Sequence, residues 1–156
     1  MSSMIIPSPT PEVAEPAIVS GPFWPDIEPS QIRLMQRIDN TITPIRLRHT
    51  LIEAISTTNG ALREWRQGQI DQGITKLIDI DAEVIDDVSI LAHRYIRAVG
   101  CLAKALLLER YRDYDSTGKG DKKAEVLTDP IDDLRRDHLH ALADITGKSR
   151  STVELI

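Results

Sequence analysis

The sequence predicts an all-α protein, an elongated bundle of long helices with an extended N-terminal arm and a strand-like C-terminal tail. Leu, Ile, Ala, Arg and Glu are frequent, and these residues favour helices. Aromatic residues make up only 4% of the 156 residues, which argues against a β-sandwich. Apolar residues recur at three- and four-residue spacing in several segments, which is the period of an amphipathic helix.

A chain of this length is most simply one domain with three parts. Residues 1–29 are a Pro-rich arm, residues 30–147 a helical domain and residues 148–156 a tail. Prolines remove amide donors and block helix, so the arm should be extended. For residues 1–20 a disordered segment is an equally open reading.

The end of the arm contains two adjacent large apolar residues, Phe23 and Trp24, followed by Pro25 and Asp26. Exposing two such side chains to water is unfavourable. We therefore expect this segment to anchor the arm on its own chain or on a neighbour.

Two helices are expected after the arm. Ser30 can cap a short helix that runs to about Ile38. Thr43 and Pro44 form an N-cap and a first-turn proline, and the apolar spacing then continues to about Gln72, a helix about 40 Å long. The poor helix formers Asn59-Gly60 predict a kink within it.

Residues 73–87 read as a connector that is rich in acidic side chains. The carboxylates do not match the calcium-binding loop pattern, which requires a glycine at the sixth position and a final glutamate. Solvated charge in a loop and at a helix N-terminus is the better interpretation. The acids are Asp79, Asp81, Glu83, Asp86 and Asp87.

A central helix should begin at Ser89, and because it is apolar on most sides it should be covered by several others. The segment 113–121 reads as a loop with two glycine breakers. The last helix is expected to start with Asp129 as cap and Pro130 as first residue, and to end at Gly147. The segment STVELI after it is β-prone.

Composition excludes several classes of function. The formal net charge of −5 disfavours a general binder of duplex DNA. A single cysteine, Cys101, allows no intramolecular disulfide and suits a reducing cytosol. The N-terminus lacks the basic and apolar regions of a signal peptide, and no apolar run reaches membrane-spanning length.

No catalytic constellation is evident, so we expect neither an enzyme nor a cofactor or metal. Gly118-Lys119-Gly120 lacks the spacing of a phosphate-binding loop and reads instead as an exposed basic loop, either partner-facing or merely solvated. His138 and His140 are two residues apart on a helix and point to different faces, so they cannot chelate one metal. His138 falls on the apolar stripe and reads as a core or interface histidine.

The main alternative is a small DNA-binding protein. Residues 142–153 are similar to the turn and first residues of a helix-turn-helix recognition helix. The chain offers barely two turns after that point, however, and its acidic balance gives little attraction to phosphates.

Three segments resemble segments of one known protein family, and they occur in the same order along the chain. They are FWPDI at 23–27, ITPIRLRHTLIEAI at 42–55 and LLLERYRDYDSTGKGDKKAEVLTDPIDDLRR at 106–136. Together they resemble the head completion protein (GPL) family of contractile-tailed phages, over roughly residues 23–156. The best-matched positions are 23–27, 109–112, 120–123 and 131–137.

The resemblance implies a structural virion protein. Such proteins form a ring beneath the portal after genome packaging, help to retain DNA and prepare the head for the tail. Expected partners are further copies in a ring that follows the portal's twelvefold symmetry, the portal protein, and a neck or tail-completion protein. Packaged DNA would pass without specific binding, and no membrane is involved. The protein would be made in the host cytoplasm and reside in the head–tail neck.

The resemblance also implies surfaces. The connector domain would be residues 30–147. Portal docking falls on the tail, Lys148, Ser149, Arg150, Ser151, Thr152, Val153, Glu154, Leu155 and Ile156. A subunit- or partner-facing loop falls on Tyr111, Arg112, Gly118, Lys119, Gly120, Asp121, Lys122 and Lys123. The candidates for acids lining the channel are Glu83, Asp86, Asp87, Asp132 and Asp133.

Overall fold

The computed structural model describes residues 14–115 and 121–150, and for residues 114, 115 and 121–129 it describes the backbone only. The protein is mostly helical, as the sequence predicts, with one small sheet. The elements are α1 Pro29–Gln36, α2 Pro44–Ala61, α3 Arg63–Asp71, the 3₁₀ turn η1 Leu77–Asp79, β1 Val84–Ile85, β2 Val88–Ser89, α4 Ile90–Asp115 and α5 Asp121–Thr146.

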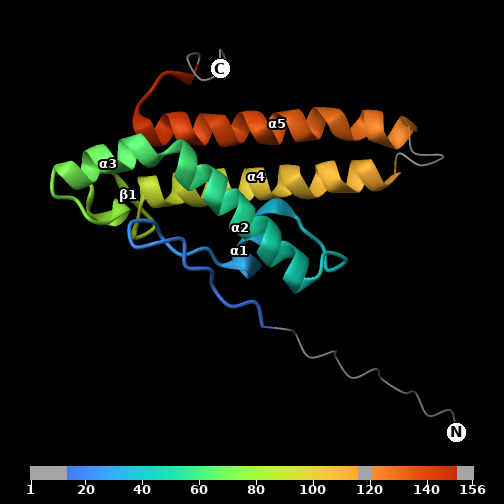
Figure 1. Cartoon of the computed structure of the whole chain (residues 1–156), viewed down its shortest axis with the longest axis horizontal. Coiled ribbons are helices and arrows are strands. Elements are labelled where there is room, and N and C mark those ends of the chain that lie inside the picture. The colour runs from blue at the N-terminus through green and yellow to red at the C-terminus, as the bar shows by residue number, and fades with distance from the viewer. Residues whose placement is uncertain (1–13, 116–120, 151–156) are drawn as a thin grey trace, which may run out of the picture.

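The two long helices, α4 and α5, lie side by side and antiparallel along the longest axis of the molecule (Figure 1). Helices α1 and α2 also pack on α4. The prediction that several elements cover the central helix is therefore confirmed. The buried face of α4 runs its length through Leu91, Ala92, Tyr95, Ala98, Val99, Cys101, Leu102, Ala103, Ala105 and Leu107.

Helix α2 begins as predicted, because the Thr43 hydroxyl accepts a hydrogen bond from the Arg46 amide and Pro44 is the first residue. The predicted helix to Gln72 is not continuous, and its break lies beside the kink predicted at Asn59-Gly60. The helix breaks at Leu62, just after Asn59-Gly60, and α3 starts at Arg63. Leu62, at the break, is buried in the core.

The start of α1 also differs from expectation, because Glu28 rather than Ser30 is the N-cap and Pro29 is the first helical residue. Proline is well suited to this position, since its missing amide would have no partner there and its φ angle is already helical. Gly100 on α4 allows α1 to approach closely, because a Cβ there would meet the Gln36 side chain at 3.2 Å.

Helix α5 starts at Asp121, eight residues before the predicted cap at Asp129, and Pro130 lies inside it. Proline in a helix interior removes one hydrogen bond at a cost of about 3 kcal/mol. Pro130 is exposed, and good helix formers such as Lys122, Lys123 and Ala124 precede it. The basic residues Lys122 and Lys123 thus belong to a helix and not to a loop.

The connector between α3 and α4 contains a β-hairpin that the sequence reading missed. Val84 pairs with Ser89 and Ile85 with Val88, so the turn consists of the two residues Asp86 and Asp87. Both have positive φ, 54° and 58°, as a two-residue type I′ turn requires. Asp-Asp is less usual in such a turn than Asn-Gly. For this reason the sequence of residues 84–89 does not indicate a hairpin.

Helix α5 ends at the predicted glycine. Gly147 has a φ of 71°, and the Lys148 amide donates to the Ala143 carbonyl at 3.1 Å, a Schellman arrangement. Beyond it, Lys148 and Ser149 are irregular and Arg150 has helical backbone, so the extended tail is not found in this described part. Residues 151–156, where most of the strand-like prediction falls, lie outside the described residues.

Candidate assembly surfaces

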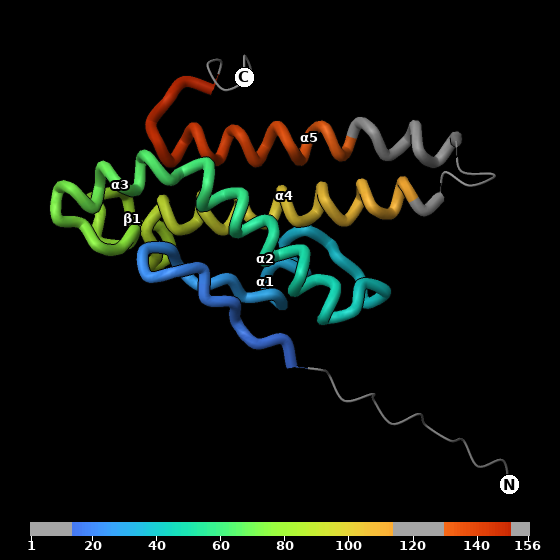
Figure 2. The backbone as a smooth tube through the Cα atoms, viewed as in Figure 1, coloured from blue at the N-terminus to red at the C-terminus, as the bar shows by residue number. Residues whose placement is uncertain are grey.

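The described part of the N-terminal arm, residues 14–28, runs against the helices on the side where α1 lies (Figure 2). Its chain doubles back on itself, because Ile18 and Ile27 exchange two backbone hydrogen bonds of 2.8 and 2.9 Å. Between them, the Phe23 carbonyl accepts from the Leu77 amide at 2.9 Å. These bonds give partners to backbone amides and carbonyls that would otherwise be buried without one.

The predicted anchor residues divide into a buried pair and an outer pair. Phe23 and Trp24 are 3% and 4% exposed, whereas Pro25 is half-buried and Asp26 is exposed. Trp24 stacks on Tyr95 of α4 with ring centroids 4.8 Å apart and an interplanar angle of 5°. Burial raises the pKa of Tyr95 to about 12, and its hydroxyl donates to Asn59 at 2.6 Å. The arm is thus held inside its own chain's core.

Polar contacts fix the arm further along. The Arg33 guanidinium binds the Glu15 carboxylate at 2.6 to 2.9 Å, and these side chains are only 13% and 10% exposed. Arg33 also donates to the carbonyls of Asp39 and Ile42, at 3.0 and 2.7 Å. One side chain therefore joins the arm, α1 and the loop before α2. Sequence reasoning missed it, since an isolated Glu and Arg 18 residues apart give no local signal.

The predicted subunit loop lies at the far end of α4 and the start of α5. Tyr111 is 58% exposed and Arg112 is partly exposed near the end of α4. Gly118, Lys119 and Gly120 lie outside the described residues. Asp121, Lys122 and Lys123 form the first turn of α5, where only the backbone is described.

The predicted docking tail is described only through Arg150. The Arg150 guanidinium binds both carboxylate oxygens of Asp144, at 3.1 and 2.8 Å. This hydrogen-bonded ion pair lowers the pKa of Asp144 and raises the pKa of Arg150. The first residues of the tail are therefore directed back along the end of α5. Ser151, Thr152, Val153, Glu154, Leu155 and Ile156 lie outside the described residues.

The candidate channel acids fall into two groups. Glu83, Asp86 and Asp87 are exposed on the hairpin before α4, and Asp132 and Asp133 are exposed on α5. On α5 the acids lie near Arg135, which binds Glu109 of α4 at 2.6 Å. The 20 residues of α4 from Ile90 to Glu109 span about 28 Å. The structure therefore does not bring the two groups together.

His138 is a core histidine, as its place on the apolar stripe predicts. It is 6% exposed, and its Nδ1 lies 2.9 Å from the Ala98 carbonyl. Burial lowers the pKa of this imidazole because the charged form loses its hydration. Within the described ranges, no three His, Cys, Asp or Glu side chains gather as a metal site, and no helix is long and apolar enough to cross a membrane.

Stability should fall as the pH drops from 7 to 5, and His138 should be the cause. Its folded pKa lies below the unfolded value of about 6.5, so the unfolded chain binds the proton first and stability is lost below that pH. One proton sets the upper limit of this slope at about 1.4 kcal/mol per pH unit. Urea titrations at several pH values measure it.

The matched control is the other histidine on α5. His138→Phe should remove most of the slope between pH 7 and 5, whereas His140→Gln should leave it in place. The ion pair of Asp144 does not interfere, because its lowered pKa affects stability only at a pH near or below 3.8. An unchanged slope in His138→Phe contradicts the assignment.

Most of the exposed large apolar side chains in the described residues belong to two stretches of the chain, and Ile70, Tyr111 and Leu139 lie outside them. One is the hairpin region, with Ile78, Val84, Ile85 and Val88. The other comprises the arm, α1 and α2, with Val19, Leu34, Met35, Ile45 and Ile52. Exposed apolar surface is common at the sites where proteins bind one another.

The comparisons specify the class. The model of the phage head completion protein (GPL) family matches residues 18–156, so the chain belongs to this family and is a phage virion component. It is 42% identical over 154 residues to a head completion/stabilization protein of Escherichia phage P2, covering 99% of this chain and 90% of that protein. No solved structure matches it.

Proposed function

We propose that the protein forms a ring beneath the portal of the phage head after DNA packaging, helps to retain the genome and prepares the head for tail attachment. The observation that supports this proposal is the 42% identity, over 99% of this chain, to a head completion/stabilization protein. In this proposal the ring follows the portal's twelvefold symmetry, and a neck or tail-completion protein binds its other side. The protein acts by binding, without catalysis.

Charge supports the role of a conduit. A formal net charge of −5 disfavours adhesion of the passing genome, because like charges repel. Asp132 and Asp133 are exposed on the long α5 helix, and we propose that they face the bore. The DNA-binding alternative gains no support from the comparisons, and Arg150, which would open a recognition helix, is paired with Asp144.

The tail is the proposed portal contact, and a truncation tests it. A chain that stops after Lys148 keeps the amide that caps α5 and loses residues 149–156. We expect normal helicity by circular dichroism and no binding to purified portal rings. Asp144→Asn is the control, because it weakens the ion pair with Arg150 but keeps every residue of the tail. Full portal binding by the truncated chain contradicts the docking role.

The proposed roles in genome retention and tail attachment are tested separately. A phage that lacks this protein should make heads that package DNA and then lose it, and these heads should not join tails. Electron microscopy and nuclease sensitivity of the heads measure both effects. Tailed, DNA-filled particles at normal yield in the absence of the protein would refute the proposed function.

A further inference from the structure

The hairpin of β1 and β2 presents an ordered apolar surface to solvent. Val84, Ile85 and Val88 are 64%, 47% and 37% exposed. The hairpin is fixed by its ladder, by the Ile90 amide donating to the Glu83 carbonyl at 2.8 Å, and by the His93 ring 2.9 Å from the Ile85 carbonyl. A rigid surface loses little conformational entropy on binding, so it is well suited to docking.

The chain that carries this apolar surface is predominantly acidic. Residues 77–88 contain five acids, Asp79, Asp81, Glu83, Asp86 and Asp87, and no Lys or Arg. All five side chains are exposed. A partner surface for the hairpin should therefore combine an apolar recess with positive charge.

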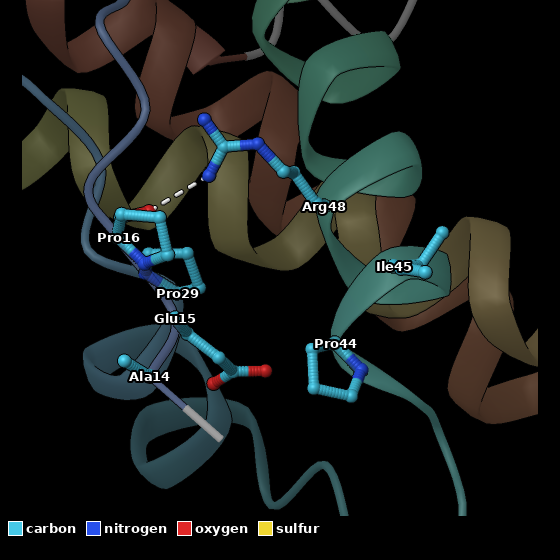
Figure 3. Close-up of a pocket in the computed structure, with 7 residues that line it drawn as sticks. All are labelled: Ala14, Glu15, Pro16, Pro29, Pro44, Ile45 and Arg48. Atoms are coloured by element: carbon cyan, nitrogen blue, oxygen red, sulfur yellow. Dashed lines mark hydrogen bonds between the residues drawn. The ribbon is translucent and has the colours of Figure 1, made fainter.

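The start of α2 combines an apolar recess with positive charge. A hollow of about 210 Å³ lies between the arm and α2, lined by Ala14, Glu15, Pro16, Pro29, Pro44, Ile45 and Arg48. Figure 3 shows the arm residues on one side of it and the α2 residues on the other. Its two charged groups already have partners, since Glu15 binds Arg33 and Arg48 donates to the Pro16 carbonyl at 2.8 Å. The remaining lining is aliphatic.

The hollow is small, and the first turns of α2 beside it carry basic side chains. It is smaller than a usual site for a small-molecule ligand, about 300 Å³ or more. Ile45 at its edge is 72% exposed and has no apolar cover. Residues 44–52 carry Arg46 and Arg48 and no acid, and Arg46 and His49 are exposed.

We infer that the hairpin of one copy docks on the start of α2 of the next copy, with the apolar hairpin side chains filling the hollow between arm and α2. The inference rests on the proposed ring, for which it supplies the contact. The two surfaces lie on different parts of the chain (Figure 1), so the contact is head-to-tail, the type that closes into a ring. The acids Glu83, Asp86 and Asp87 then belong to the subunit interface and not to the bore.

Two variants test the contact without endangering the fold. Asp86→Asn with Asp87→Gly removes two interface acids and gives the hairpin the residues that a type I′ turn prefers. Arg46→Glu reverses the charge on α2 and places a Glu three residues after the Thr43 cap, which completes a capping box. Both changes should leave thermal stability equal or higher.

Sedimentation velocity of the full chain at low salt measures the association. Wild type should associate with rising concentration, and each variant alone should do so about tenfold or more weakly. An equal mixture should form dimers at wild-type affinity, because the intact hairpin of Arg46→Glu meets the intact α2 of the other variant. The charge-matched control, Asp132→Asn with Asp133→Asn, should associate as wild type does.

Three results would overturn the inference: a wild-type chain that stays monomeric up to about 1 mM, variants that associate like wild type, or a mixture that forms no dimers. These outcomes are separate from a failure of the proposed function. Normal particles without the protein refute the function, whereas unaltered association of the variants refutes only this contact.

Discussion

Replacing Trp24 by Ala should lower the free energy of unfolding by about 3 to 5 kcal/mol, the range for removing a large buried side chain. Trp24 is 4% exposed and lies flat on Tyr95, with Phe23 edge-on at 4.8 Å. Its removal leaves a cavity between the arm and α4 that neither backbone can close. Urea unfolding followed by circular dichroism measures the loss.

The same change should release the arm before the helices unfold. The backbone bonds between Ile18 and Ile27 depend on the chain reversal that Phe23 and Trp24 hold in place. Hydrogen exchange at these two amides should speed up strongly. Val19→Ala is the control, because Val19 lies on the same arm and is 76% exposed, so its stability effect should stay within about 0.5 kcal/mol. A loss below about 1 kcal/mol for Trp24→Ala would contradict the anchor role.

Replacing Arg33 by Met should cost about 3 kcal/mol, because it leaves the Glu15 carboxylate nearly buried without its partner. The carbonyls of Asp39 and Ile42 also lose their donor. Thermal unfolding monitored by calorimetry should show the loss as a lower Tm. Arg46→Met, at an exposed position on α2, should change stability by less than about 0.5 kcal/mol.

A double-mutant cycle separates the ion pair from the other contacts. Glu15→Gln in the Arg33→Met background should recover part of the loss, because a neutral amide is less costly to bury than an unpaired carboxylate. The loss of stability that remains measures the two hydrogen bonds from Arg33 to the carbonyls of Asp39 and Ile42. If Glu15→Gln recovers nothing, the pair does not hold the arm.

The hollow proposed as the docking surface depends on the Arg33 contact. Glu15 and Pro16 line the hollow on the arm side, and they keep their place only while Glu15 stays bound to Arg33 and Pro16 to Arg48. Arg33→Met should therefore also weaken the association of copies.

Local patterns predicted the elements whose signals lie within a few residues. Thr43-Pro44 identified the start of α2, and Gly147 identified the end of α5, since a cap and a left-handed glycine act on the adjacent turn alone. The apolar stripe of α5 predicted a core or interface histidine at His138, and this side chain lies in the core. The hairpin was missed because Asp86-Asp87 is an unusual type I′ turn, and the start of α5 was missed because Pro130 looked like a first residue.

By itself, the sequence determined the helical class, the family resemblance and the principal caps, because each depends on composition, on order along the chain or on contacts within one turn. Only the tertiary structure decided that Trp24 stacks on Tyr95, that Arg33 holds Glu15 and that a hollow opens beside Ile45. Those features join residues 18 to 71 positions apart. Such pairings depend on how the helices pack, which no local periodicity encodes.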